Sequence, residues 1–476
     1  MPPTAWVTVQ TVVTQVIAIG LFAIQAPLLG PTAFGLFSFV MVFVGFCELV
    51  LNGGVTEALI SIRSIEDRHY SVVTTISAAF SLVLGLIIFV TAHPLAQLCG
   101  QPDSYQLFRY MAVLPLITSF AAAPSAAAKR EMHFRALAVR AIVGWVAGGT
   151  VGVILAFRGD GAWALVFQAL IQRVVSVIAL WLSVPIRLRF AWSSRHLQDV
   201  WKYTAPIVLA SVMGWAQGQI PRLILGIWLG PTDLGLFSMA TRLCEILVQT
   251  AVVPSTVVAR VSLRKFALNP EGRDEAIHRV LYNMCAWCFP LSIGGAALLP
   301  DLFHVWLDAR WYPGIVASQL MLLMAVPMVT VYLGNAILMA FNEQHYDALI
   351  STLQTISTVV VVLIAAPFGL LIAVLAILVR PFLLFPLQIS ILTRHCAIRA
   401  RVLFAPQLPS LAAACLAGAV VYFSRPVLEA HLGSALTLVS LGTAGLIIYF
   451  AALAAGSPQG TAALTGRLRL FGRSAP

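Results

Sequence analysis

The chain has 476 residues, of which 60% are hydrophobic and only 10% are charged, and its formal net charge is +11. Soluble domains carry roughly 25% charged residues, so the composition excludes an ordinary soluble protein and predicts one embedded in a membrane. In such a protein, excess positive charge is typical of cytoplasmic loops beside anionic lipid, and it does not indicate nucleic-acid binding.

Apolar stretches follow one another along the chain, with short polar breaks between them. A helix needs about 20 apolar residues to cross the hydrocarbon core of a bilayer. The stretches therefore predict an all-α integral membrane protein with about 14 transmembrane helices. In chain order, they are expected near residues 6–28, 34–57, 71–92, 106–127, 137–157, 162–184, 204–228, 235–260, 280–300, 314–340, 347–367, 370–392, 408–424 and 436–455.

A ten-residue segment after the first predicted helix occurs again after the seventh. LGPTAFGLFS at Leu29–Ser38 returns as LGPTDLGLFS at Leu229–Ser238, with eight of the ten positions identical. In each copy, Gly-Pro ends one helix and a later glycine permits a tight entry to the next, so we expect a hairpin turn rather than a substrate contact. Six helices separate the copies, which predicts two parallel repeats. We expect six-helix lobes at residues 1–200 and 201–397, followed at 398–476 by two additional helices and a basic tail.

Lysine and arginine gather in alternate breaks, and this pattern predicts the orientation of the chain. Short loops rich in these residues are retained in the cytoplasm, so both termini are expected to be cytoplasmic. One basic break holds Lys129, Arg130, Arg135 and Arg140, whereas the opposite breaks hold only Arg109, Arg158, Arg310 and Arg425.

Few ionisable residues fall deep inside the predicted helices, and most of them are arginines. A charge in hydrocarbon is costly and normally faces protein or water, so these residues are candidates for a functional site. Arginines outnumber acids, which predicts a cationic cavity suited to an anion, since guanidinium binds phosphate through two parallel hydrogen bonds. The candidates for substrate binding are Arg173, Arg222, Arg242 and Arg380, and the two acids are Glu48 and Glu245.

Most of these candidates also have a structural interpretation. Arg242 and Glu245 lie three residues apart, where a salt bridge within the helix would neutralise both. Arg380 precedes Pro381, so it could instead bond carbonyls freed by a proline kink. Glu48 and Glu245 could load a proton or a sodium ion during transport, or each could pair with an arginine.

The sequence carries no motif for catalysis or for a bound cofactor or metal. Nucleophile elbows, phosphate-binding loops, HExxH and paired zinc motifs are absent, and the CxxC at Cys285 and Cys288 lies in an apolar helix without a second pair. An oligosaccharide ligase or polymerase would need a large outer loop for its reacting groups, and the outer breaks are short. We therefore expect a transporter without a cofactor, and not an enzyme.

Two segments around the repeated turn resemble a known family. They are LGPTAFGLFSFVMVFVGF, beginning at Leu29, and RLILGIWLGPTDLGLFSMATRL, beginning at Arg222. With the helix count and the duplication, they resemble the lipid-linked oligosaccharide flippases, the Wzx-like polysaccharide-transporter branch of the multidrug/oligosaccharidyl-lipid/polysaccharide (MOP) superfamily. Members often carry an aspartate before the arginine of the second segment, where this chain has Pro221.

The resemblance implies a flippase that moves a polyprenyl diphosphate-linked oligosaccharide to the outer face of the inner membrane by alternating access, for exopolysaccharide, capsule or O-antigen. Its implied partners are membrane lipids, a polysaccharide polymerase and glycosyltransferases. A MATE-like exporter of organic cations is disfavoured, because its cavity should be acidic and it typically lacks the last two helices. A lipid II flippase is a closer alternative, which the sequence separates poorly.

Overall fold

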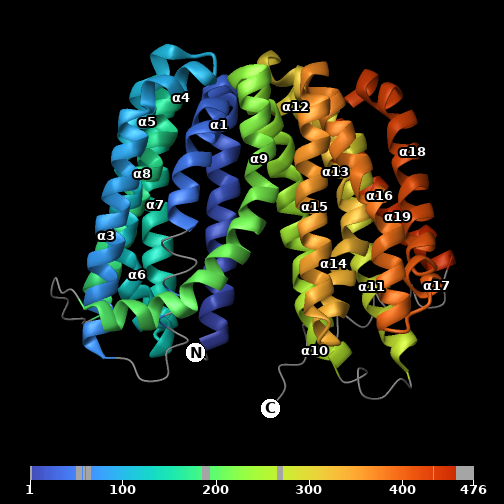
Figure 1. The fold of residues 1–476 in the computed structure, drawn as a ribbon. Coiled ribbons are helices and arrows are strands. Elements are labelled where there is room, and N and C mark those ends of the chain that lie inside the picture. Colours follow the sequence, from blue (N-terminus) through green and yellow to red (C-terminus); the bar gives the residue numbers. More distant parts are fainter. Residues whose placement is uncertain are drawn as a thin grey trace. The chain divides into compact units, whose positions relative to one another are not determined.

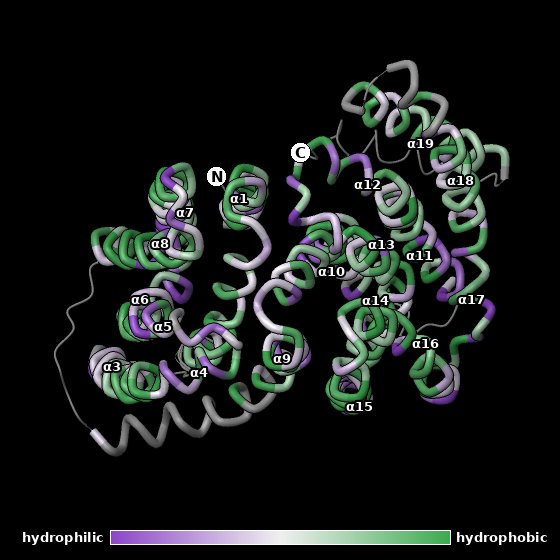
Figure 2. The backbone as a smooth tube through the Cα atoms, turned by 90° about the horizontal axis from the view of Figure 1, so that it is seen from above, coloured by the Kyte–Doolittle hydropathy of each residue, from purple (hydrophilic) through white to green (hydrophobic). Residues whose placement is uncertain are grey.

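The structure, a computed structural model, describes residues 3–49, 56, 59, 66–184, 193–264, 272–432 and 434–456. Every regular element in this part of the chain is helical (Figure 1), which confirms the predicted all-α class. Hydrophobic residues occur along nearly every helix (Figure 2). Such helices satisfy their backbone hydrogen bonds internally, as a hydrocarbon environment requires.

The chain forms two compact units, residues 1–238 and 239–476. The first unit holds α1 (Pro3–Glu48), α3 (Asp67–Val90), α4 (Ala92–Leu98), η2 (Pro102–Ser104), α5 (Tyr105–Met111), α6 (Leu114–Arg130), α7 (Phe134–Arg158), α8 (Ala162–Ser183) and most of α9 (Ser194–Leu247). The second unit continues with η3 (Val248–Val252), α10 (Val253–Arg264), α11 (Arg273–Phe289), η4 (Pro290–Gly294), α12 (Gly295–Trp306), η5 (Ala309–Gly314), α13 (Ile315–Leu323), α14 (Ala325–Ala340), α15 (Gln344–Ala365), η6 (Ala366–Phe368), α16 (Leu370–His395), α17 (Ala400–Phe404), α18 (Gln407–Leu432) and α19 (Ser434–Gly456). The two six-helix lobes expected from the sequence stay a prediction.

The described residues hold 12 helical segments that are long and apolar enough to cross a membrane. Two of them, Ala5–Glu48 and Ser211–Thr256, have 44 and 46 residues, about twice the length that one crossing needs. Each is interrupted at a glycine with non-helical backbone, Gly30 at φ 73° and Gly230 at φ 83°. The multi-pass membrane fold is therefore established, while the count of 14 crossings stays a prediction.

Helices α7 and α8 pack closely through a row of glycines. Gly144, Gly148 and Gly152 lie on one face of α7, because they are four residues apart. A Cβ on Gly148 would lie 2.5 Å from the carbonyl oxygen of Gln168 and 2.7 Å from the Cβ of Gln172 on α8. Small residues at this spacing let two membrane helices approach at backbone distance, and they fix the position of the α8 side chains.

The two copies of the repeated turn contact each other inside the first unit. A Cβ on Gly35 would overlap the backbone carbonyl of Pro231, and a Cβ on Gly235 would overlap that of Pro31. The hydroxyls of Thr32 and Thr232 lie 3.0 Å apart, within hydrogen-bonding distance. The contact is therefore reciprocal, and both glycines are required because backbone occupies the space where a side chain would stand.

In the second unit, a buried ion pair joins α12 to α18. Nε of Arg425 lies 2.6 Å from Oδ1 of Asp301, whose side chain is only 3% exposed. The last two helices are thereby fixed to the helices that precede them, since losing the guanidinium leaves a buried carboxylate without its cation.

We expect Arg425→Ala to destabilise the second unit by about 1–3 kcal/mol, the usual penalty for a buried charged group that loses a partner. Thermal unfolding in detergent and limited proteolysis after α16 measure this effect. The matched control is Arg310→Ala, because Arg310 pairs with Asp308 at the surface, where an ion pair contributes little. Equal behaviour of the two variants would show that the buried pair does not hold α18.

Candidate functional site

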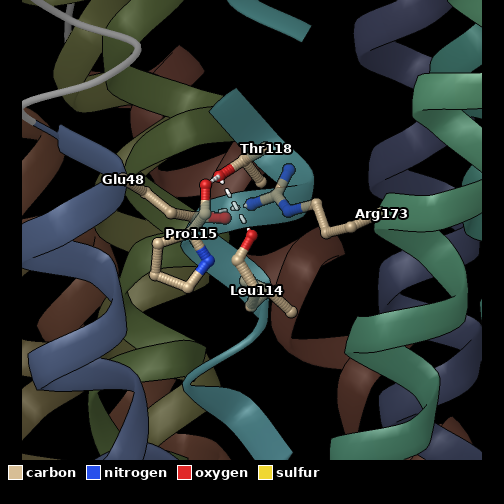
Figure 3. A network of polar contacts seen from close by, with 5 residues as sticks. All are labelled: Glu48, Leu114, Pro115, Thr118 and Arg173. Atoms are coloured by element: carbon tan, nitrogen blue, oxygen red, sulfur yellow. Dashed lines mark hydrogen bonds and ion pairs between the residues drawn. The ribbon is translucent and has the colours of Figure 1, made fainter. Parts of the chain in front are cut away.

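An ion pair between α8 and α1 is the first feature of the site. Nη2 of Arg173 lies 2.9 Å from Oε2 of Glu48 (Figure 3), and the two side chains are 41% and 12% exposed. The other carboxylate oxygen, Oε1, is buried and accepts no hydrogen bond from any described residue. Thr118 of α6 lies beside the pair, and its hydroxyl donates to the carbonyl oxygens of Leu114 and Pro115.

A polar pocket of about 260 Å³ lies inside the first unit, beside this ion pair. We call it the basic pocket, because three cationic side chains face it and no acid is among its described lining residues. Its lining residues are Thr56, Thr118, Ala121, Ser125, Lys129, Arg140, Arg173, Ser176 and Val177. Nε of Arg140 is buried and has no hydrogen-bond partner among the described residues.

Sequence reasoning assigned Lys129 and Arg140 only to a cytoplasmic break, and so it missed two members of the basic pocket. Arg140 lies almost two turns inside α7, and Lys129 belongs to the last turn of α6. A signal was present on α6, where Thr118, Ser125 and Lys129 follow one another at steps of seven and four and so share one face. That polar stripe on an alanine-rich helix could have indicated the pocket.

Three predicted arginines lie outside the lining of the basic pocket. On α9, Arg222 donates to Oε1 of Gln219 at 3.2 Å. Further along α9, Arg242 and Glu245 are 3.8 Å apart and are 33% and 49% exposed, the within-helix pairing that the sequence left open. The structure therefore brings each acid to one arginine, but only Arg173 also lines the basic pocket.

Arg380 of α16 is buried and bonds the neighbouring helix α15. Its Nη1 donates to the carbonyl oxygen of Gln354 at 2.8 Å and to the hydroxyl of Thr358. The carbonyl it bonds belongs to α15 and not to α16, the helix that contains Pro381. These contacts tie α15 to α16 within the second unit.

A second pocket has a volume of about 430 Å³. It lies between η4 and α12 on one side and the last two helices, α18 and α19, on the other. Its lining is almost entirely apolar and includes Leu291, Leu298, Val421, Leu438 and Tyr449. Glycines of α12 and α19 leave this space open because they carry no side chain. An apolar pocket of this kind accepts hydrocarbon and offers no group for binding an anion.

The cysteines provide neither a metal centre nor a reactive thiol outside the membrane-spanning segments. All seven are free thiols, and no group of three His, Cys, Asp or Glu side chains suited to a metal ion occurs in the part of the chain that the structure describes. Burial raises the pKa of Cys99 to about 12 and that of Cys396 to about 11, so neither is a thiolate at neutral pH.

Comparison with known proteins places the chain in a family of polysaccharide biosynthesis proteins. A family model described as "Polysaccharide biosynthesis protein" matches residues 24–316. The succinoglycan biosynthesis transport protein ExoT of Rhizobium meliloti (strain 1021) is 26% identical over 289 residues, covering 60% of this chain and 58% of that protein. The teichuronic acid biosynthesis protein TuaB of Bacillus subtilis (strain 168) is 19% identical over 341 residues, covering 70% of each.

Two solved structures share the fold. Lipid II flippase MurJ in an inward closed conformation superposes with a TM-score of 0.76 at 13% identity, covering 94% of this chain and 97% of that one. An inward-facing MATE family transporter of the MOP superfamily gives a TM-score of 0.60 at 17% identity, covering 83% of this chain and 99% of that one. These likenesses confirm the predicted fold class. With a family match over more than half of its length, the chain belongs to the polysaccharide biosynthesis protein family and is a multi-pass membrane protein with the fold of MOP superfamily transporters.

Proposed function

We propose that this transporter is a flippase for a polyprenyl diphosphate-linked oligosaccharide. It moves the lipid from the cytoplasmic to the outer face of a bacterial inner membrane, where surface polysaccharide is assembled. The relative ExoT is named a transport protein of succinoglycan biosynthesis and TuaB a protein of teichuronic acid biosynthesis, and both names fit a membrane step in building a polymer. The chain spans about 58% of ExoT, so the activity and the substrate are proposals.

The observation that carries this proposal is the charge of the basic pocket. Lys129, Arg140 and Arg173 line it, and no acid is among the lining residues that the structure describes. This charge suits a diphosphate and repels an organic cation. The same observation disfavours a MATE-like exporter of cations. In this proposal Arg173 contacts the headgroup. The further headgroup ligands that the sequence predicts are Arg222, Arg242 and Arg380.

The proposed transport is by alternating access between inward-open and outward-open states of two six-helix lobes, with both termini in the cytoplasm. Headgroup and sugars pass through a cavity while the polyprenyl tail stays in lipid or in apolar grooves of the protein. A diphosphate is negative, and moving one charge through 100 mV changes its free energy by about 2.3 kcal/mol. A membrane potential negative inside therefore favours outward movement. Glu48 and Glu245 remain candidates for coupling to an ion, and glycosyltransferases and a polymerase are the proposed partners.

A lipid II flippase is the second candidate, because MurJ shares the fold over 94% of this chain. Both substrates are polyprenyl diphosphates, so the headgroup chemistry of the basic pocket does not separate them. The phenotype of a deletion does, since loss of a lipid II flippase stops cell-wall synthesis, whereas loss of a surface-polysaccharide flippase leaves the wall intact.

Deletion of the gene is expected to abolish surface polysaccharide while a diphosphate-linked oligosaccharide accumulates on the cytoplasmic face of the membrane. Sidedness labelling of the extracted lipid measures this accumulation, and the wild-type gene should reverse it. If the labelled precursor still reaches the outer face at the normal rate, the proposed flippase activity is wrong. If instead the wall precursor accumulates, the second candidate is correct.

A further inference from the structure

We infer that a short helical hairpin in the second unit tilts about its base, and that the last two helices restrain this movement. The hairpin consists of α12, η5 and α13, residues 295–323, and we call it the flap. Its two helices have 12 and 9 residues, so they are about 18 and 14 Å long and cross only part of a hydrocarbon core about 30 Å thick. Figure 1 shows α12 and α13 toward one end of the second unit and α11 and α14 toward the other.

The first helix of the flap joins α11 through a bending point. The connection is the π-helical turn η4, Pro290–Gly294. Proline has no N–H, so Pro290 cannot donate to the carbonyl of Ala286, four residues earlier. No described atom lies within 4 Å of a Cβ placed on Gly294. Helices bend at prolines and at π-helical turns, and the open space at Gly294 leaves room for the bend.

The second helix of the flap has its own bending point. α13 ends at Leu323 and α14 begins at Ala325, and Pro327 in the first turn of α14 cannot donate to the carbonyl of Leu323. The two bending points are joined, because the buried hydroxyl of Ser292 in η4 donates to the carbonyl oxygen of Leu322 at 2.7 Å. Both helices of the flap can therefore tilt together, as one piece.

The last two helices contact the chain on both sides of the first bending point. On the α11 side, the hydroxyl of Tyr449 on α19 donates to the carbonyl oxygen of Ala286 at 3.0 Å, the carbonyl to which Pro290 cannot donate. On the flap itself, Asp301 pairs with Arg425 of α18 at 2.6 Å. A helix pair attached on both sides of a bending point restrains the bend. The flap can tilt freely only when the pair between Asp301 and Arg425 opens.

The apolar pocket lies beside the first bending point and gives the flap space to move. Its lining includes Pro290, Leu291 and Gly295 at the base of the flap, and Ala417 and Val421 on α18. In a close-packed interior, a shift of one helix displaces its neighbours. Here a volume of about 430 Å³ separates the bending point from the last two helices, so the base of the flap can shift without displacing them.

The test is a distance measurement between two spin labels by double electron–electron resonance, on the purified full-length protein in nanodiscs. The labels are attached at Val305→Cys on the flap and Ile364→Cys on α15, which are exposed positions, and the exposed thiol Cys415 is replaced by serine. A tilt of about 20° moves the end of a helix 18 Å long by about 6 Å. The control labels, Arg279→Cys on α11 and Leu349→Cys on α15, lie outside the flap.

The double variant Asp301→Asn with Arg425→Gln releases the flap without leaving one charge buried alone. We expect it to shift or broaden the Val305–Ile364 distance by several Å and to leave the control distance unchanged. Gly294→Ala is the opposite change, because alanine forms helix better than glycine and its methyl group meets no described atom within 4 Å. It should narrow the flap distance, whereas Gly20→Ala in the first unit should leave it unchanged.

Two results would overturn the inference. One is a flap distance that is the same in the wild type, the double variant and Gly294→Ala. The other is equal broadening of the flap and control distances, which would mean that the whole second unit loosens. Size-exclusion profiles and thermal unfolding identify folded variants. If the double variant does not fold, Tyr449→Phe replaces it, because it removes only the hydroxyl that bonds Ala286, and it should broaden the flap distance. Export in cells is a separate readout, so the flap and the proposed flippase activity can fail independently.

Discussion

Replacing Arg173 with glutamine is expected to lower export of surface polysaccharide by roughly tenfold or more, because the substrate phosphate loses a charge-assisted contact. The same change leaves Glu48 buried without its cation, which alone could impair the protein. The double variant Glu48→Gln with Arg173→Gln separates these causes, since it removes both charges. If Arg173 binds phosphate, the double variant stays as inactive as the single one. The measurement is surface polysaccharide in a deletion strain that expresses each variant at equal level.

Arg158→Gln is the matched control for this prediction. Arg158 is an exposed arginine at the end of α7, so its replacement changes the net charge equally without touching the basic pocket. Export by this variant should equal that of the wild type. Full export by the double variant would contradict a phosphate contact and would mean that Arg173 serves only to neutralise Glu48.

Gly35→Ala is expected to destabilise the first unit by on the order of 3 kcal/mol or more, which is the upper range for overpacking. The added methyl group would overlap the carbonyl of Pro231, and a backbone group cannot turn aside as a flexible side chain can. Gly235→Ala should behave alike, because its methyl group meets Pro31 in the same way. Thermal unfolding in detergent and the amount of protein in the membrane measure the effect.

The control for this second prediction is Gly20→Ala on the same helix. Nothing lies within 4 Å of a Cβ at Gly20, and alanine favours helix by about 0.5–1 kcal/mol. This variant should therefore be as stable as the wild type or slightly more stable. Equal melting temperatures of the Gly35→Ala and Gly20→Ala variants would contradict a close contact between position 35 and the carbonyl of Pro231.

The class of the fold could be predicted from the sequence because its cause is local. A run of about 20 apolar residues can bury its backbone in lipid only as a helix, whatever the rest of the chain does. The breaks at Gly30 and Gly230 are local too, since Gly-Pro disfavours a continuous helix. The bounds of the helices differ from the predicted ones, because helices such as α11 with α12 run on through π-helical turns that no composition rule reveals.

The contacts between helices could not be predicted in the same way. Helical spacing correctly indicated that Arg242 and Glu245 share a face, but it could not show that Glu48 reaches Arg173, 125 residues further along. Helical periodicity identifies the side chains that share one face of a helix, but it does not identify the helix that packs against that face. Arg140 was not recognised as a candidate site residue. The rule that positive charge gathers in cytoplasmic loops already accounted for it. Charge bias and the basic pocket coincide in this part of the chain.

The reciprocal contact of the repeated turns links the histories of the two halves of the gene. Each glycine is needed because of the backbone of the other copy, so a substitution in either copy meets an obstacle that the other copy provides. The two glycines are therefore constrained by packing and not only by the turn that each one forms. Related chains should therefore keep glycine at both positions, even where the rest of the two turns differs.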